Sequence, residues 1–371
     1  MRATATASTT TARPVALGPS LTRALVVLGG GGVVLGAVTV VAVAIGSHGV
    51  AIGDTFAILG HRLLGLPLAQ PLIPGDESII FDVRLPRVLT AMLVGGGLAL
   101  AGTVFQAILR NPMADPYIIG TAAGASLGAI AGLMAPMLVP ALVIGAGSSW
   151  LGLGAVQVMA FAGGLGTVLL VYAVSRANGR APAVTLLLTG YAVSSVLAAG
   201  VALLMFFSGQ RLNAIFSWLM GSLAAAEWTN LAFAAPILVI SATLLIGRWR
   251  GLNLFLLGDG AAAHLGVNVE REKLVLTMLA TLATSTVVAI SGTIGFVGLV
   301  VPHVLRLAIG PDHRLLLPAS VLYGAALLAL ADLGARLAGG IPVGIVTALI
   351  GAPFFIWLLR RSHLLRPVVT L

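Results

Sequence analysis

The segment from Arg84 to Gly124 constrains the fold of this chain more than any other part of the sequence. It begins with Arg84-Leu85-Pro86-Arg87 and continues through about twenty uncharged residues, enough to cross the hydrocarbon core of a bilayer. Polar residues return at 110–116, and a series of glycines follows. Because charged residues stand at both ends of the apolar run, they mark where the run leaves the lipid. We therefore expect a membrane-spanning helix with unusual turns at its ends, which is typical of a working part rather than a plain anchor.

The whole chain is too apolar to build a soluble surface. It is 59% hydrophobic and 8% charged, whereas soluble domains carry roughly 25% charged residues. The net charge of +9 comes from basic residues spread over the loops, without the clustered basic stripe and interleaved aromatics of nucleic-acid binding. The absence of cysteine excludes disulfides and thiol chemistry. The composition therefore predicts an all-α polytopic membrane protein in contact with lipid.

Charge-free runs place the membrane spans. Residues 116–175 predict two spans, broken by the Pro136–Pro140 segment and the glycines that follow it. Residues 274–305 predict a pair, one of them short, divided by the glycine-rich 291–298 segment. The single spans are 24–46, 88–109, 181–210, 228–247, 315–331 and 337–359. The total is about ten transmembrane helices, some short or interrupted, and 212–226 predicts a partial helix near one membrane face.

The basic residues predict the orientation. With an even number of spans, both termini share one side of a bacterial cytoplasmic (inner) membrane. If that side is the cytoplasm, as the positive-inside rule favours, few basic residues lie outside. They are Arg62, Arg84, Arg87, Arg211 and Arg336. We expect a disordered cytoplasmic tail at 1–23, a transmembrane domain at 24–362 with a long cytoplasmic loop at about 248–273, and a second cytoplasmic tail at 363–371.

Two series of glycines predict how the helices pack. Glycines at every fourth position from 120 to 132 would let a neighbouring backbone approach one helix face, as in ordinary tight packing. Gly292, Gly295 and Gly298 precede Pro302 and favour an interrupted helix at a functional junction. The Gly-Thr pairs at 102–103 and 292–293 each end an apolar run, and the two runs point in opposite directions. This arrangement would suit an inverted repeat.

The spans hold little enzyme chemistry. Asp332 is the one acid inside an apolar run, and Arg336 is one helical turn away, so an ion pair between them is expected. Proton-coupled carriers usually need several such acids or histidines. The histidines show no metal-ligand spacing, so no metal or other cofactor is expected. The single lysine, Lys273, is not preceded by a phosphate-binding glycine loop, so a partner must supply any energy from ATP.

The loop at 257–267 is where a partner could act on the chain. Glycines frame a short predicted helix, with Asp259 as its N-cap and Gly266 at its end. This helix would expose alanine, histidine and leucine side chains to the cytoplasm. A helix lying on the membrane is the alternative, and we favour a protein-docking helix.

Several motifs together resemble the permease subunits of ABC importers for iron-siderophores, haem and cobalamin, the FecCD family. The resemblance covers residues 30–362 and depends on the order and spacing of its parts. The matching parts are Arg84-Leu85-Pro86-Arg87, Gln106, residues 110–116, Leu265-Gly266-Val267, residues 295–303, Asp312-His313-Arg314, Ala331-Asp332 with Arg336, residues 342–347 and residues 351–354.

The resemblance implies a membrane-spanning subunit of an ATP-driven importer, which is not itself an enzyme. Its partners would be two cytoplasmic ATP-binding subunits, an extracytoplasmic substrate-binding protein and a second permease copy, with a homodimer favoured. Arg84, Arg87 and Arg336 would receive acidic residues of the binding protein, although the first two could anchor a span to headgroups and the third could be occupied by Asp332. The coupling residues would be Asp259, Ala262, His264, Leu265, Gly266 and Val267, and the cytoplasmic gate would contain Asn111 and Met113.

The sequence leaves the cargo open among ferric siderophore, haem and corrinoid chelates. A path lined by small and apolar side chains would hold such a chelate weakly, which suits release. The principal alternative is a secondary carrier that works without an ATPase. A membrane-embedded enzyme or structural scaffold would require intramembrane acids that the spans lack.

Overall fold

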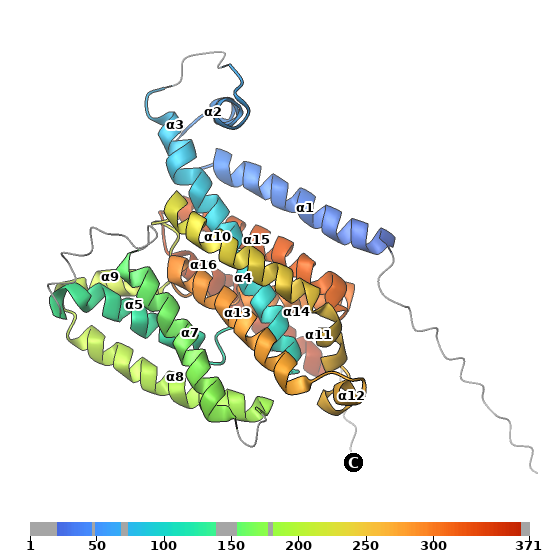
Figure 1. Cartoon of the computed structure of the whole chain (residues 1–371). Helices are drawn as coiled ribbons and strands as arrows, with labels where there is room; N and C mark the ends of the chain where they lie inside the picture. The colour runs from blue at the N-terminus through green and yellow to red at the C-terminus, as the bar shows by residue number, and fades with distance from the viewer. Residues whose placement is uncertain (1–20, 47–48, 68–72, 139–153, 177–180, 365–371) are drawn as a thin grey trace, which may run out of the picture.

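The chain folds into a bundle of helices (Figure 1). A computed structural model describes residues 21–46, 49–67, 73–138, 154–176 and 181–364. Every regular element within these ranges is helical, which confirms the predicted all-α class. The predicted N-terminal tail lies outside the described residues up to position 20, and helix α1 begins at Leu21. Most of the predicted C-terminal tail, 365–371, also lies outside them.

Ten apolar helices of the described residues correspond to the predicted spans. Seven are long and apolar enough to cross a membrane, and three are shorter. The long ones are α1 (Leu21–Ala44), α4 (Leu85–Ile108), α7 (Ala155–Ser175), α8 (Ala183–Phe206), α10 (Trp228–Gly247), α13 (Val269–Ser291) and α15 (His313–Leu337). The shorter ones are α5 (Thr121–Leu138), α14 (Val297–Ile309) and α16 (Val343–Leu364). The Pro136–Pro140 break itself falls partly outside the described residues.

Helix α4 is the central helix of the bundle. It is continued at its N-terminal side by a π-helical segment (Ile79–Arg84) and by α3 (Asp76–Ser78). Its glycines let neighbouring backbones approach closely: a Cβ added at Gly95 would lie 2.2 Å from the carbonyl oxygen of Gly324 in α15, and one at Gly102 would lie 1.8 Å from that of Gly298 in α14. Side chains at these positions would therefore force α15 and α14 away from α4.

The first glycine series packs α5 against α7. A Cβ at Gly124 would lie 2.3 Å from the carbonyl oxygen of Gly163, and one at Gly128 would lie 2.0 Å from that of Met159. The contact confirms the tight packing predicted from the spacing of these glycines.

The second glycine series breaks the chain between α13 and α14. Residues 292–296 are not helical, and both Gly292 and Phe296 have a φ of 68°, in the left-handed region. A non-glycine residue rarely adopts this conformation, so the surrounding packing holds Phe296 in it. The predicted interruption is confirmed, and its role at a functional junction stays a prediction, as does the inverted repeat.

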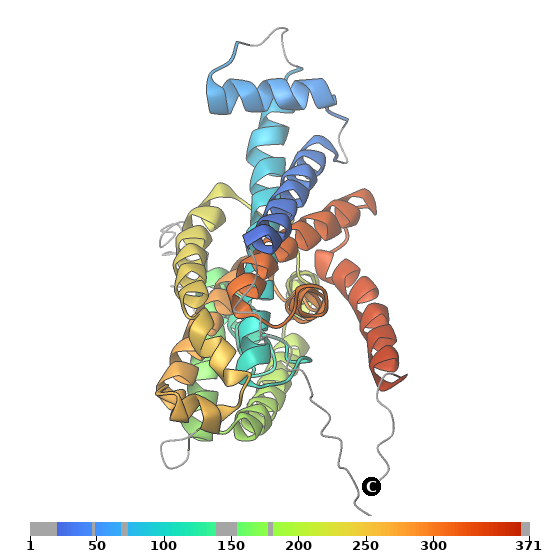
Figure 2. The same ribbon diagram turned by 90° about the vertical axis from the view of Figure 1, so that its right-hand side faces the viewer.

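Short helices lie at the two ends of the bundle. Helix α2 (Ile52–Leu64) runs crosswise beyond one end, over the extension of α4 (Figure 2). Helices α11 (Trp249–Phe255) and α12 (Asp259–His264) lie together at the opposite end (Figure 1). We call these the α2 end and the α12 end. Helix α9 (Leu212–Leu219), preceded by a 3-10 turn (Gly209–Arg211), is the partial helix expected at 212–226, whereas α2 was not predicted.

Candidate functional site

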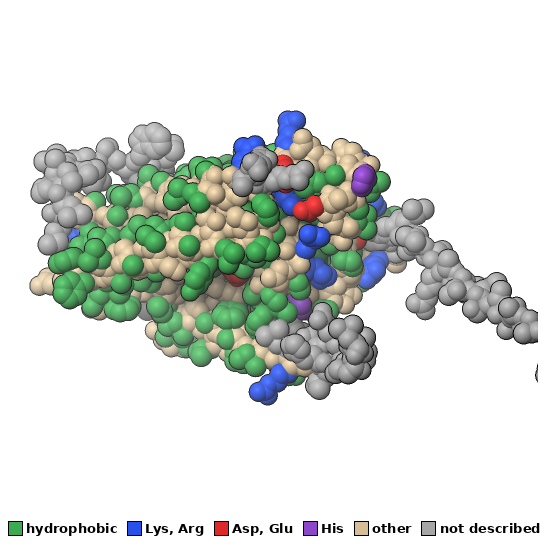
Figure 3. Space-filling view, turned by 90° about the horizontal axis from the view of Figure 1, so that it is seen from below, with side chains coloured by type: hydrophobic (Ala, Val, Ile, Leu, Met, Phe, Trp, Pro, Cys, Tyr) green, Lys and Arg blue, Asp and Glu red, His purple; other side chains and the backbone are tan. Residues whose placement is uncertain are grey.

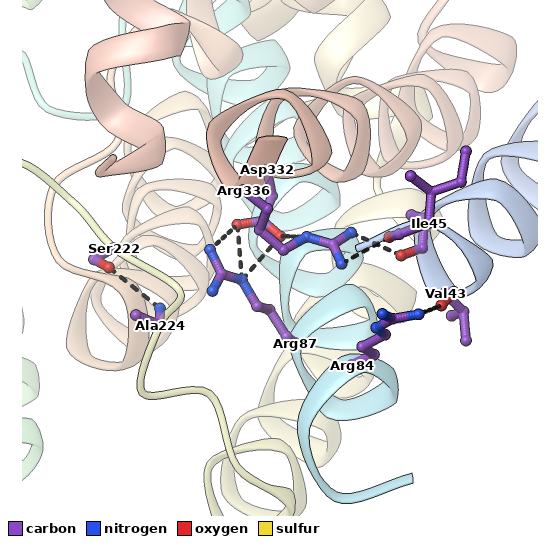
Figure 4. Close-up of polar contacts among 9 residues, drawn as sticks. Val43, Ile45, Arg84, Arg87, Ser222, Ala224, Asp332 and Arg336 are labelled. Atoms are coloured by element: carbon purple, nitrogen blue, oxygen red, sulfur yellow. Dashed lines mark hydrogen bonds and ion pairs between the residues drawn. The ribbon is translucent and has the colours of Figure 1, made fainter. Parts of the chain in front are cut away.

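Two arginines at the α2 end share one carboxylate. Arg87 Nη2 lies 2.8 Å from Asp332 Oδ1, and Arg336 Nε lies 3.2 Å from Asp332 Oδ2 (Figure 4). The Asp332 side chain is only 1% exposed. The expected Asp332–Arg336 ion pair is confirmed, but the sequence did not indicate that Arg87 is a second partner. A carboxylate this deeply buried requires such compensation, because an unpaired buried charge is costly.

The remaining donors of the arginine cluster bind the end of α1. A helix leaves its last carbonyl groups without intrahelical partners, and cations are favourable near this terminus. Arg84 and Arg336 donate hydrogen bonds of 2.7–3.3 Å to four such carbonyl oxygens, and Figure 4 labels Val43 and Ile45 among the acceptors. The acceptors are Ala42, Val43, Ala44 and Ile45. A Cβ at Gly46 would lie 2.6 Å from Arg84 Nε, so a glycine here leaves room for the guanidinium group.

The structure therefore brings together all three arginines proposed to receive a binding protein. It also places them inside the protein: Arg84 is 4% exposed, Arg336 is 8% exposed and the Arg87 side chain is 15% exposed. Their contacts tie α1 and α15 to α4. The docking role stays a prediction, and it requires a partner that can reach Arg87 in particular.

Helix α12 is held from one side by a buried lysine. Lys273 Nζ donates a hydrogen bond of 2.5 Å to Asp259 Oδ2, and the Lys273 side chain is 4% exposed. The predicted N-cap is wrong: Gly258 is the N-cap, without a side-chain cap bond, and Asp259 is the first helical residue. Its carboxylate instead forms an ion pair with Lys273, near the start of the neighbouring α13.

The other side of α12 is exposed at the surface of the chain. His264 and Leu265 are exposed, with Leu265 at 61%, and Gly266 is exposed too. Gly266 ends the helix as predicted: its φ is 87°, and Val267 N donates to the carbonyl oxygen of Ala262, as in a Schellman motif. Ala262 itself is fully buried, so the expectation that the alanines face outward is wrong at this position.

The proposed gate residues lie in the loop between α4 and α5. Asn111 and Met113 are half-buried, and Asn111 Oδ1 accepts a 2.9 Å hydrogen bond from Met113 N. Arg110 starts the loop with a φ of 47°. A Cβ added at Gly258 would lie 3.3 Å from Arg110 Nη1, so the loop begins directly beside the start of α12. The predicted gate and the predicted coupling segment are thus neighbours in space.

The same loop also reaches the break between α13 and α14. Tyr117 Oη donates to the carbonyl oxygen of Ile294 at 3.1 Å and accepts from Ile294 N at 3.2 Å. Asp115 Oδ1 accepts a hydrogen bond from Tyr117 N. Burial raises the pKa of Asp115 to about 6, and the hydrogen bond from Tyr117 lowers it in part. The loop therefore connects α12 to the interrupted segment in the middle of the bundle.

A second polar contact joins α4 to α14. Arg306 Nη1 donates to Gln106 Oε1 at 2.8 Å, and Gln106 Nε2 donates to the carbonyl oxygen of Leu299 at 3.2 Å. The sequence analysis included Gln106 among the motifs but indicated no partner for it. The only sequence signal was the proximity of Arg306 to an otherwise apolar run.

Within the part of the chain that the structure describes, no group of three or more histidine, aspartate, glutamate or cysteine side chains could hold a metal ion. The polar groups near the two ends form structural contacts instead: ion pairs, helix-end hydrogen bonds and the Asp312 cap of α15, which accepts from Arg314 N. Their arrangement can connect helices mechanically.

Comparison with known proteins identifies the family. The FecCD transport family profile matches residues 34–361, so the chain belongs to this family. The chain is 42% identical over 337 residues, 88% of each protein, to the cobalamin import system permease protein BtuC of Halobacterium salinarum. It is 41% identical over 289 residues, 77% of this chain and 84% of the relative, to the hemin transport system permease protein HmuU of Yersinia pestis.

A solved structure shares the fold. It is described as an inward-facing conformation of a metal-chelate type ABC transporter, and it is 34% identical in sequence. The match has a TM-score of 0.73 and covers 91% of this chain and 99% of that chain. The chain is therefore a multi-pass membrane protein whose relatives are permease subunits of ABC importers.

Proposed function

We propose that this chain is the membrane-spanning subunit of an ATP-driven, binding-protein-dependent importer. It carries an iron-siderophore, haem or corrinoid chelate into the cytoplasm. Two copies form the path, two ATP-binding subunits bind the α12 end on the cytoplasmic side, and the substrate-binding protein docks at the α2 end. Family membership supports the importer class, and the names of two relatives, for cobalamin and hemin, support the cargo class.

The observation that carries the proposal is the two-sided setting of α12. Lys273 and the buried Ala262 fix the helix to the bundle, while Leu265 is presented to the exterior. A helix that is fixed on one side and apolar on the other can pass on the motion of a partner that grips it. ATP binding would close the two partner subunits and displace α12 together with the start of the gate loop at Arg110.

Replacing Leu265 and Gly266 with aspartate tests the coupling. Leu265 is exposed, so an aspartate at this position should leave the fold intact. Gly266 is exposed too, but it has the left-handed φ that glycine favours, so a substitution there would strain the backbone. Leu265→Asp alone is therefore the sharper variant, and Leu265→Met, which keeps an apolar side chain at the same exposed position, is its matched control. We expect loss of uptake and of substrate-stimulated ATP hydrolysis in vesicles for Leu265→Asp. Normal uptake by this variant would remove α12 from the coupling.

The proposed docking at the α2 end needs a variant that leaves no unpaired buried charge. The single variant Arg87→Gln meets this need, because Asp332 keeps its ion pair with Arg336. If Arg87 receives an acidic residue of the binding protein, binding-protein affinity should fall while the purified chain keeps its fold. Unchanged affinity would leave the arginine cluster with a structural role only.

A secondary carrier remains the alternative reading of the sequence, and a single experiment separates the two. Vesicles that contain this chain without any ATP-binding subunit should show no uptake driven by ion gradients. Uptake in such vesicles would overturn the proposed dependence on ATP. A panel of ferric siderophores, haem and corrinoids in the complete importer would then identify the cargo.

A further inference from the structure

A basic pocket opens at the α12 end, between the foot of α10, helix α11 and the start of α13. Its volume is about 390 Å³. The charged groups in its lining are Arg248, Arg250, Arg271 and Glu272, three cations against one anion. Viewed from this end, Lys and Arg side chains gather on one part of the surface, with hydrophobic side chains over much of the rest (Figure 3).

The single acid of the pocket already forms an ion pair within the protein. Glu272 Oε2 accepts from Arg248 Nη1, and a Cβ added at Gly251 would lie 2.7 Å from Glu272 Oε1, so the carboxylate is pressed against α11. Arg250 and Arg271 are exposed, and among the described residues neither forms an ion pair. The pocket therefore has an uncompensated positive charge that suits an anion.

Arg250 also has a fixed direction. Its guanidinium lies 5.2 Å from the centre of the Trp249 ring, and that of Arg314 lies 4.3 Å from the same ring. Stacking of this kind limits the freedom of a long side chain and keeps its charge near the pocket. The aromatic ring itself lies where α10 ends, a position typical of side chains at the membrane interface.

An apolar stripe on α10 leads to this pocket. Val239, Ile240 and Leu244 are exposed, and Leu244 precedes Arg248 by one helical turn. Ile240, Leu244 and Arg248 share one helix face, because residues four apart are neighbours on a helix, whereas Val239 lines a hollow between α10, α1 and α4. Thr243, on the same face, donates its hydroxyl to the carbonyl oxygen of Val239, so it adds no unsatisfied polar group. The stripe is a surface for hydrocarbon, and it ends at the arginines.

We propose that the pocket binds the phosphate headgroup of an anionic phospholipid, with an acyl chain lying along the exposed stripe of α10. The complementary charges account for the headgroup, and the continuous apolar face accounts for the chain. A free phosphate would use only the arginines, and an acidic surface of a partner protein would not use Ile240, which lies well within the span. This inference needs neither the cargo nor the partners of the proposed function.

Native mass spectrometry of the full chain tests the site directly. The probes are a phosphatidylglycerol and a phosphatidylcholine with the same acyl chains. We expect clearly tighter binding of the anionic lipid. The double variant Arg250→Gln, Arg271→Gln should weaken phosphatidylglycerol binding about 30-fold, because each basic residue near an anionic headgroup contributes about 1 kcal/mol. Phosphatidylcholine binding should change little.

Two further variants show whether weaker lipid binding could instead come from misfolding or from a change in net charge. Glu272→Gln removes the only acid of the pocket and should tighten phosphatidylglycerol binding, opposite in sign to the arginine variants. Arg360→Gln, at an exposed basic residue near the end of α16, should have no effect. If Arg360→Gln weakened phosphatidylglycerol binding as much as a single arginine substitution in the pocket, the response would only reflect net charge, which would overturn the proposal.

The remaining outcomes separate other occupants. Equal binding of the two lipids would overturn the proposal. Displacement of phosphatidylglycerol by millimolar inorganic phosphate would assign the pocket to a free anion instead. If the arginine variants lost an ATP-binding subunit but kept full lipid affinity, the surface would belong to that partner and the lipid site would be refuted.

Discussion

A buried acid near one end of the bundle forms ion pairs, whereas a buried acid near the other end forms none among the described residues. At the α2 end, Asp332 is almost fully enclosed and lies against Arg87 and Arg336, while Arg84 and Arg336 bind the carbonyl groups at the end of α1. In the loop near the α12 end, Asp115 forms no ion pair among the described residues, and burial raises its pKa. The arginine cluster connects the helices of the α2 end through a shared buried carboxylate, whereas the loop near the α12 end contains a buried acid that forms no ion pair among the described residues.

The difference indicates where the molecule can move. Breaking the arginine cluster would expose several buried charges at once, so the contacts of α1, α4 and α15 should stay fixed through a transport cycle. The loop at 109–120 is held instead by single hydrogen bonds and close packing, which can exchange at a lower cost. We therefore expect conformational change to concentrate near the α12 end.

The largest expected effect follows from Asp332→Asn. This change leaves Arg87 and Arg336 buried around a neutral amide, and breaking a buried ion pair in this way typically costs about 3–5 kcal/mol. The free energy of unfolding, measured by denaturant titration in mixed micelles, should fall by that amount. A loss below about 1 kcal/mol would show that the cluster is not held by charge.

The next largest effect concerns transport rather than stability. Asp259→Asn removes the partner of the buried Lys273 and loosens α12. Uptake per ATP hydrolysed should fall roughly tenfold, within the range of typical coupling energies. The double variant Asp259→Asn, Lys273→Met removes the unpaired charge as well, so it should regain thermal stability without regaining uptake. Recovery of uptake by the double variant would contradict the role of this ion pair.

A smaller effect is expected from Asp115→Asn, and it depends on pH. The folded pKa of Asp115, about 6, lies above its ordinary value of 3.8, so the folded chain binds this proton more tightly than the unfolded chain. The charged form therefore opposes folding above about pH 6, and the penalty decreases as the pH falls toward 4. The variant should be stabilised relative to the original chain at neutral pH, and the difference should shrink in melts at lower pH. An unchanged difference would mean that Asp115 is well solvated.

The smallest effect is expected from Glu77→Gln, also at the α2 end. Glu77 forms an ion pair with Arg62, but their side chains are 39% and 52% exposed. Exposed pairs contribute about 0–1 kcal/mol. The same denaturant titration should therefore barely distinguish this variant from the original chain, which provides the control for Asp332→Asn. A loss as large as that of Asp332→Asn would show that the whole α2 end is equally sensitive.

The sequence predicted the spans well because span length is a local property. A helix in lipid must satisfy its own backbone hydrogen bonds, so an uninterrupted apolar run of sufficient length is enough to predict it. The same reasoning predicted the interruption at 292–296 and the end of α12 at Gly266, since both depend on glycine backbone conformations. Helix α2 was missed because it is too short to span a membrane and its apolar residues are interrupted by polar ones.

Tertiary structure alone decided which charges meet. Arg87 and Asp332 are separated by 245 positions along the chain, and no pattern in either segment indicates the other. The partners of Lys273, Gln106 and Arg84 could not be predicted from the sequence either. The capping role assigned to Asp259 was wrong because its carboxylate binds Lys273 instead. An apolar run determines that a helix crosses the membrane, but its rotation and neighbours come from packing, and these decide whether a charge is buried, paired or left facing lipid and solvent.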